Sequence, residues 1–158
     1  MTARTFARRY PVRLIGLAAA LVLGTALVIQ HGFGYLPCAL CYRQRWPYYL
    51  WIGLGLVALI RPSLPALLLV AAATGLVSAG LGLHHLGVER DWWAGPAACA
   101  GGLSGDLDKI LDDVMAAPIV PCDEPTWTFL SLSMADYNFL ISLGLTGFAL
   151  WARTARRA

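Results

Sequence analysis

The segment Leu14–Ile29 reads LIGLAAALVLGTALVI, and it decides the class of fold because it contains no charged residue. Three similar uncharged apolar segments follow it, at Trp46–Ile60, Ala66–Leu83 and Tyr137–Ala152. Each is slightly shorter than the ~20 residues that cross a ~30 Å hydrocarbon core, but flanking Arg, Trp and Tyr side chains can extend it. We therefore expect an all-α membrane protein, a four-transmembrane-helix bundle that forms one domain over residues 1–158. The expected spans cover roughly 13–30, 45–60, 65–84 and 135–152.

The composition excludes the two main alternatives to a membrane protein. Of the 158 residues, 58% are hydrophobic and 13% are charged. Soluble domains contain about 45–50% apolar and about 25% charged residues. A soluble globule of this size could not cover its surface with so few charges, and a disordered chain requires low hydrophobicity.

The charges are divided between two sides of the expected membrane. All nine acidic residues lie between Glu89 and Asp136, together with only two basic residues, so this stretch carries a net charge of −7. The rest of the chain has ten basic residues and no acidic one. By the positive-inside rule, both termini and the turn at Arg61 are cytoplasmic, and the loops at roughly 31–44 and 85–134 face outward. The basic residues form no long run, so we expect no nucleic-acid partner.

The first apolar segment has one alternative interpretation, as a cleavable signal peptide. It has the basic start and apolar middle that such a peptide requires. However, no small-x-small cleavage site follows it before Gln30–Phe33. A retained first span is therefore the preferred interpretation.

Residues 103–115 of the second outward loop are predicted to form a short amphipathic helix. Apolar residues repeat there at helical spacing, opposite several aspartates, with Ser104 as a possible cap and Pro118 beyond the end. The apolar face either packs on protein or anchors on the bilayer. Further along, Ser133 with Asp136 three residues later predicts a capping box at the start of the fourth span.

The third span carries a face of small residues. Ala71, Gly75, Ala79 and Gly82 recur at helical spacing. Such a face allows close approach of a neighbouring helix in a membrane.

The four cysteines are the candidate functional residues. Cys38, Cys41, Cys99 and Cys122 all lie in the outward-facing loops. In an oxidising compartment an even number of cysteines indicates disulfides, so they form either two structural staples or a redox relay. A bridge between Cys38 and Cys41 closes too short a loop to stabilise much, whereas C-x-x-C suits thiol–disulfide exchange. Because 22 residues separate Cys99 from Cys122, the spacing is not typical of a zinc site, and we expect no metal.

Cys41 has two features that favour a thiolate. It lies near an expected helix start, for which Pro47 suits the first turn, and Arg45 follows one turn later. Both the helix terminus and the guanidinium would lower the pKa of Cys41. Cys99 and Cys122 flank the predicted loop helix, where a bridge would be accessible to another protein.

These motifs resemble the DsbB family of bacterial disulfide bond formation proteins. The first outward loop and second span contribute Thr25-Ala26-Leu27, Gln30-His31 and Pro37-Cys38-Ala39-Leu40-Cys41 with Arg45. The second loop contributes Gly95-Pro96 before Cys99, and Cys122-Asp123-Glu124. The resemblance covers nearly the whole chain.

The resemblance implies a monomeric oxidoreductase of the bacterial inner membrane with periplasmic cysteines. Such a protein reoxidises a DsbA-like thioredoxin-fold protein and passes the electrons to a quinone, ubiquinone or menaquinone. By position, Cys99 would form the mixed disulfide with DsbA, Cys122 would be its pairing partner, Cys38 would exchange with that pair, and Cys41 would face the quinone.

The resemblance also implies quinone contacts. Arg45 would support the Cys41 thiolate and the quinone. The family's histidine falls on His84-His85, of which His85 gives the better local match, with His31 as a weaker candidate.

Three alternatives remain open from the sequence. A paralogue serving one dedicated substrate would have much the same sequence. An enzyme similar to vitamin K epoxide reductase would share the logic, although its pattern of active-site residues is not visible. A structural membrane protein with two disulfide staples would need no quinone.

Overall fold

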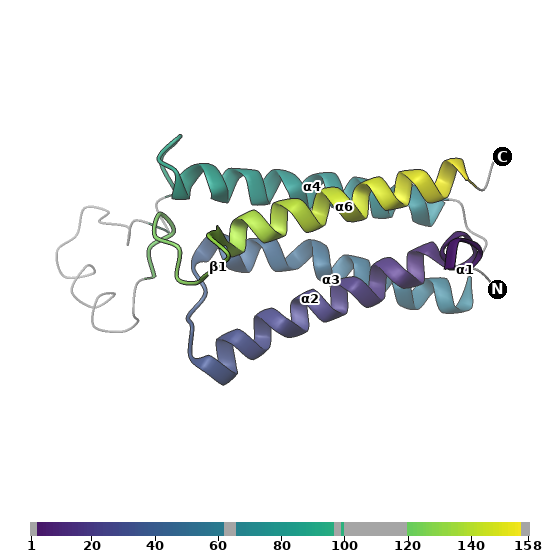
Figure 1. Ribbon diagram of the computed structural model, residues 1–158, viewed down its shortest axis with the longest axis horizontal. Coiled ribbons are helices and arrows are strands. Elements are labelled where there is room, and N and C mark those ends of the chain that lie inside the picture. Colours follow the sequence, from purple (N-terminus) through teal and green to yellow (C-terminus); the bar gives the residue numbers. More distant parts are fainter. Residues whose placement is uncertain (1–2, 62–65, 97–98, 100–119, 156–158) are drawn as a thin grey trace.

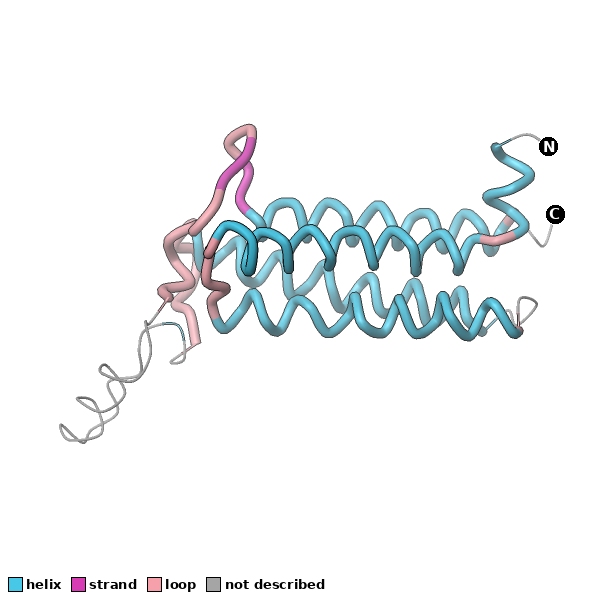
Figure 2. Tube along the Cα trace, turned by 90° about the horizontal axis from the view of Figure 1, so that it is seen from below, coloured by secondary structure: helices cyan, strands magenta, loops and turns pink. Residues whose placement is uncertain are grey.

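The computed structural model describes residues 3–61, 66–96, 99 and 120–155. In these residues four long helices lie side by side (Figures 1 and 2). In chain order the elements are α1 (Ala3–Arg9), α2 (Pro11–Phe33), α3 (Ala39–Ile60), α4 (Ala66–Glu89), β1 (Thr128–Phe129), β2 (Leu132–Ser133) and α6 (Met134–Thr154). The start of α2 and the end of α6 lie at one end of the bundle, and the two strands lie at the other (Figure 1).

Among the helices that the structure describes, two are long and apolar enough to cross a membrane. They are α2 and α4, with mean hydropathy of 2.3 and 2.1 over their most apolar windows. The described elements are five helices and two two-residue strands, which confirms that the fold is mostly helical. The predicted helix over 103–115 lies outside the described residues.

The second and third long helices extend beyond the predicted spans. α3 begins at Ala39, so Pro47 lies inside the helix and not in its first turn as predicted. α4 continues to Glu89. The predicted spans counted only uncharged apolar residues, whereas a helix continues through polar turns if its terminal backbone groups find partners. At the start of α3 that partner is the Cys38 sulfur, which accepts a hydrogen bond from the backbone N–H of Cys41.

Small residues allow the helices to pack closely. A Cβ atom on Gly16 of α2 would lie 2.8 Å from the Gly55 Cα of α3. A Cβ on Gly82 of α4 would lie 3.0 Å from the backbone nitrogen of Phe139 in α6. The predicted small-residue face of α4 is confirmed, because all four of its members are buried.

Buried polar contacts connect the helices inside the bundle. Trp51 of α3 is fully buried and its indole N–H donates to the Ala71 carbonyl at 2.9 Å. The Tyr48 hydroxyl donates to Asn138 Oδ1 of α6 at 2.8 Å. Such contacts fix the register of helices that hydrophobic packing alone would leave free to slide.

A short hairpin leads into α6, which begins with a capping box. β1 and β2 pair antiparallel, and the turn between them has positive φ at Leu130 (50°) and Ser131 (63°). The predicted capping box of Ser133 and Asp136 is confirmed. Asp136 also accepts a hydrogen bond from Arg90 at 3.0 Å, which joins the end of α4 to the start of α6.

Candidate thiol–disulfide site

The fold brings all four cysteines to one end of the bundle. Cys99 and Cys122 form a disulfide, while Cys38 and Cys41 are free thiols. Cys38, Cys99 and Cys122 are buried and belong to one apolar cluster, against which Cys41 packs. A dithiol and a disulfide therefore share one cluster, which is the arrangement that exchange between them requires.

The pKa values of the two free thiols are shifted in opposite directions. Their Sγ atoms lie 3.0 Å apart. Hydrogen bonding with Cys41, together with His85 and the Cys41 backbone N–H, lowers the pKa of Cys38 to about 4, despite burial. Cys41 precedes the expected span at 45–60. The pKa of Cys41 is raised, mainly by its hydrogen bond with Cys38 and, second, by burial.

The expectation that Cys41 has the lowered pKa is therefore wrong for this dithiol. Cys38 is the residue at the N-cap, so the amide at the helix start acts on the Cys38 sulfur. A second negative charge beside that thiolate is unfavourable. The Arg45 guanidinium lies over the ring of Tyr42, 4.8 Å from its centroid.

His85 lies beside Cys38. Its Nε2 atom is 3.6 Å from Cys38 Sγ and 3.7 Å from Glu89 Oε1, and its Nδ1 is 2.7 Å from the Gln44 side-chain nitrogen. The His85 and Glu89 side chains are 4% and 8% exposed. The other two candidates are exposed: His84, whose ring stacks on Trp93, and His31 at the end of α2.

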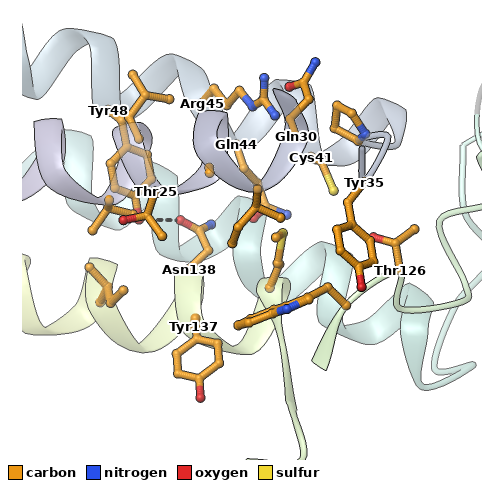
Figure 3. A pocket seen from close by; sticks show the side chains of 18 of the residues that line it. Thr25, Gln30, Tyr35, Cys41, Gln44, Arg45, Tyr48, Thr126, Tyr137 and Asn138 are labelled. Atoms are coloured by element: carbon orange, nitrogen blue, oxygen red, sulfur yellow. Dashed lines mark hydrogen bonds between the residues drawn. The ribbon is translucent and has the colours of Figure 1, made fainter. Parts of the chain in front are cut away.

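A cavity of about 370 Å³ lies between α2, α3, α6 and the loop before β1. Figure 3 shows the Cys41 sulfur pointing into it and Arg45 at its wall. Within the described residues, the lining includes Gln44 but not His85. The polar residues of the wall are Thr25, Gln30, Tyr35, Gln44, Arg45, Tyr48, Thr126, Tyr137 and Asn138.

One polar atom of the cavity wall lacks a partner. Among the side chains that the structure describes, Gln30 Oε1 is buried without a hydrogen bond. A buried unpaired amide oxygen is costly, so such an atom in a cavity wall suggests a polar ligand group.

The comparisons with known proteins identify the family. Residues 8–152 match the family described as "Disulfide bond formation protein DsbB". The chain belongs to the DsbB family. Its similarity to the Disulfide bond formation protein B of Pasteurella multocida is 34% identity over 81% of this chain and 75% of that protein. The Polaromonas sp. protein of the same name is 29% identical over 94% of both chains, and an uncharacterized protein of Rickettsia prowazekii is 33% identical over 81% of this chain and 77% of its own. No solved structure matches the chain significantly.

As a member of the DsbB family, the chain is a disulfide bond formation protein of a membrane and a disulfide oxidoreductase. Potential ligand atoms of Cys38, Cys41 and His85 lie within 4.8 Å of one another, close enough for a soft metal ion. We assign the group to thiol chemistry, because that is the chemistry of the family.

Sequence reasoning did not identify two residues of the site. Glu89 and Gln44 both contact His85. Glu89 is four residues after His85, which is a helical spacing, and this signal could have paired them if α4 had been extended past residue 84. Gln44 has no such signal, because its contact joins two helices.

Proposed function

We propose that this DsbB-family protein reoxidises a DsbA-like thioredoxin-fold protein in the periplasm and passes the electrons to a membrane quinone, its second substrate. One observation carries the proposal. The two sulfurs of a single C-x-x-C lie 3.0 Å apart but have different surroundings. Cys38 packs with the Cys99–Cys122 disulfide, whereas Cys41 lines the cavity between the helices.

The electron path follows from these neighbours. The partner's thiolate would attack the Cys99–Cys122 bridge at Cys99, and the released Cys122 thiolate would attack Cys38 of an oxidised Cys38–Cys41 bridge, which breaks and releases Cys41. Once Cys38 is in a disulfide it carries no charge, and the main cause that raises the pKa of Cys41 is removed. Cys41 would then become the thiolate that faces the quinone. Loss of the hydrogen bond with the Cys38 thiolate thus couples exchange on one side to reduction on the other. When the partner leaves as its own disulfide, Cys99 and Cys122 rejoin, and Cys38 and Cys41 are left as the two thiols that the structure shows.

The cavity suits a quinone head group. Its volume of about 370 Å³ lies within the usual ~300–1,000 Å³ of small-molecule sites, and its wall is mostly apolar. The Arg45 guanidinium and the Gln30 amide N–H groups can donate to quinone oxygens, and the unpaired Gln30 Oε1 can accept from a quinol hydroxyl. DsbA, at about −120 mV, needs an acceptor of higher potential, and ubiquinone or menaquinone is such an acceptor.

All four long helices expose apolar side chains, which supports four spans. On α3, Leu56 and Ile60 are 59% and 80% exposed. On α6, Leu140 and Leu150 are 52% and 47% exposed. Large exposed apolar surface on every helix suits contact with lipid. With both termini in the cytoplasm of a bacterial inner membrane, the cysteines are periplasmic.

A coupled assay tests the proposal. Purified protein is mixed with a reduced DsbA-like protein and a short-chain ubiquinone, and thiols and quinone absorbance are followed together. We expect one quinone reduced for each disulfide formed in the partner. Oxidation of the partner without quinone loss, or inert cysteines, would contradict the proposal and favour two structural staples.

A labelling experiment tests the topology. After reduction of intact cells, a membrane-impermeant maleimide should modify Cys99 and Cys122 from the periplasmic side. Labelling only after the inner membrane is broken would show that the cysteines face the cytoplasm. Thr154→Cys gives the opposite control, because its thiol should react only in broken cells.

A further inference from the structure

Two buried side chains near Cys38, those of His85 and Glu89, have no role in the steps proposed above. His85 and Glu89 lie one helical turn apart on α4, and both side chains are more than nine-tenths buried. Burial of an acid and an imidazole is unfavourable unless each has partners. The contacts of this pair lead to one reacting atom, the Cys38 sulfur.

We propose that Cys38, His85 and Glu89 form a proton-holding triad, in which His85 Nε2 takes the proton lost by Cys38 and the Glu89 carboxylate beside the same nitrogen stabilises the protonated ring. His85 is then a catalytic residue, because it touches a reacting sulfur. Glu89 acts through His85 and is a positioning residue. The inference rests on the proposed function, since it gives these residues a role in that reaction.

The contacts of Glu89 fix its position in the triad. Oε1 faces His85 Nε2 at 3.7 Å, and Oε2 accepts a short hydrogen bond from the Ser133 hydroxyl. Ser133 is itself held by the capping box of α6. The carboxylate therefore faces the same Nε2 atom as the Cys38 sulfur, and it stabilises the protonated imidazole by its charge, while Gln44 contacts the opposite ring nitrogen.

Gln44 occupies the other side of the imidazole. Its amide can donate to an unprotonated Nδ1 or, after rotation, accept from a protonated one, because an amide carries both groups. His85 can thus take up and release a proton while keeping this contact. Gln44 also lines the cavity, so it separates His85 from the space assigned to the quinone.

The triad serves the step that closes the Cys38–Cys41 disulfide. Two S–H bonds break, one S–S bond forms, and two electrons pass to the quinone. The two thiol protons balance the two that the quinone gains on becoming a quinol. His85 holds the Cys38 proton between these events, so that Cys38 is a thiolate when it bonds to the Cys41 sulfur and the electron pair passes to the quinone.

Other titratable groups lie near the triad, and their effects on Cys38 must be distinguished from the effect of Glu89. Cys41 adjoins Cys38, Glu124 lines the same small cavity as His85 and Glu89, and Asp136 acts on Glu89 from α6 while paired with Arg90. A carboxylate that merely lies near Cys38 would repel its thiolate. A carboxylate that acts through His85 would favour that thiolate, so the two roles have opposite signs.

A double-mutant cycle tests this sign without quinone or partner protein. The reduced Cys99→Ser/Cys122→Ser protein is treated with iodoacetamide across pH, and mass spectrometry follows modification of Cys38 alone. Glu89→Gln should raise the midpoint of Cys38 reactivity by about one pH unit, which is a tenfold loss of thiolate below that midpoint. His85→Gln alone should raise it too. With His85→Gln present, Glu89→Gln should produce no further rise.

Two outcomes would overturn the triad. One is a downward shift on Glu89→Gln with His85 intact, which means simple repulsion. The other is the same upward shift with and without His85. Glu124→Gln is the matched control and should leave the midpoint unchanged, and Glu89→Gln retains the size and polarity needed for the Ser133 contact. Because only reduced thiols are required, failure here leaves the coupled quinone assay unaffected.

Discussion

Cys38 and Cys41 lie 3.0 Å apart, yet Cys38 contacts His85 and Cys41 lines the cavity. A single C-x-x-C thus connects a buried polar group and a disulfide on one side with an apolar cavity on the other. Both sulfurs adjoin the disulfide cluster, but within the described residues Cys38 contacts His85 and Cys41 lines the larger cavity. The separate roles of the two cysteines lead to the predictions that follow.

Replacing the two cysteines should block different steps. Cys41→Ser should reduce quinone turnover to background, because the described lining of the cavity then contains no thiol, while still allowing the partner protein to attack the Cys99–Cys122 disulfide. A mixed disulfide with the partner should therefore be detectable on a non-reducing gel. Undiminished quinone reduction by Cys41→Ser would contradict the assignment.

The pH dependence of Cys38 follows from its lowered pKa. A folded-state pKa of about 4, below the ordinary 9.0, means that the Cys38 thiolate persists as the pH falls and is lost only near pH 4. The pKa of Cys41 is raised, so Cys41 remains a thiol until high pH. In the reduced protein, alkylation of Cys38 should stay nearly constant down to about pH 5. Burial slows this reaction but leaves the midpoint in place.

Residue-by-residue mass spectrometry of the alkylated protein measures both midpoints. Cys41→Ala should raise the midpoint of Cys38 alkylation, because it removes the hydrogen bond with Cys41 that contributes most to the lowered pKa of Cys38. A Cys38 midpoint near that of an ordinary thiol in the unmodified pair would refute this order of acidities.

Quinone affinity should depend on Arg45 and Gln30. Arg45→Leu should raise the apparent KM for quinone about tenfold, the effect of losing a charged hydrogen bond of ~1.5 kcal/mol. Gln30→Leu should raise it about fivefold, in keeping with a neutral hydrogen bond of ~1 kcal/mol. Steady-state quinone reduction measures both values.

His31→Gln is the matched control for the quinone contacts. His31 is exposed and does not belong to the described lining of the cavity, so its replacement should leave the KM unchanged. A larger effect at His31 than at Arg45 would place the quinone elsewhere.

Helix packing makes a prediction about stability. Gly16→Ala puts a Cβ 2.8 Å from the Gly55 Cα, a contact that backbone must move to relieve, so it should destabilise the protein by ~1–3 kcal/mol. Gly24→Ala on the same helix meets nothing within 4 Å and serves as the control. Thermal unfolding in detergent compares them, and equal melting temperatures would show that α2 and α3 do not cross there.

The sequence predicts the helices well but the site only in part. The four uncharged segments, the small-residue face of α4 and the capping box at Ser133 depend on local patterns, and all correspond to the structure. The acidity of the two thiols depends on which sulfur caps α3, and an apolar pattern does not locate that residue. The position of Gln44 beside His85 depends on how α3 packs against α4, which no local signal encodes.

A single anaerobic turnover of the inner cysteine pair tests the central claim most directly. The reduced Cys99→Ser/Cys122→Ser protein is mixed with a short-chain ubiquinone, and quinone absorbance and free thiols are recorded together. The account predicts that one quinone is reduced as Cys38 and Cys41 form one disulfide, and that Cys41→Ser abolishes both changes. Persistence of both thiols with no loss of quinone would contradict it.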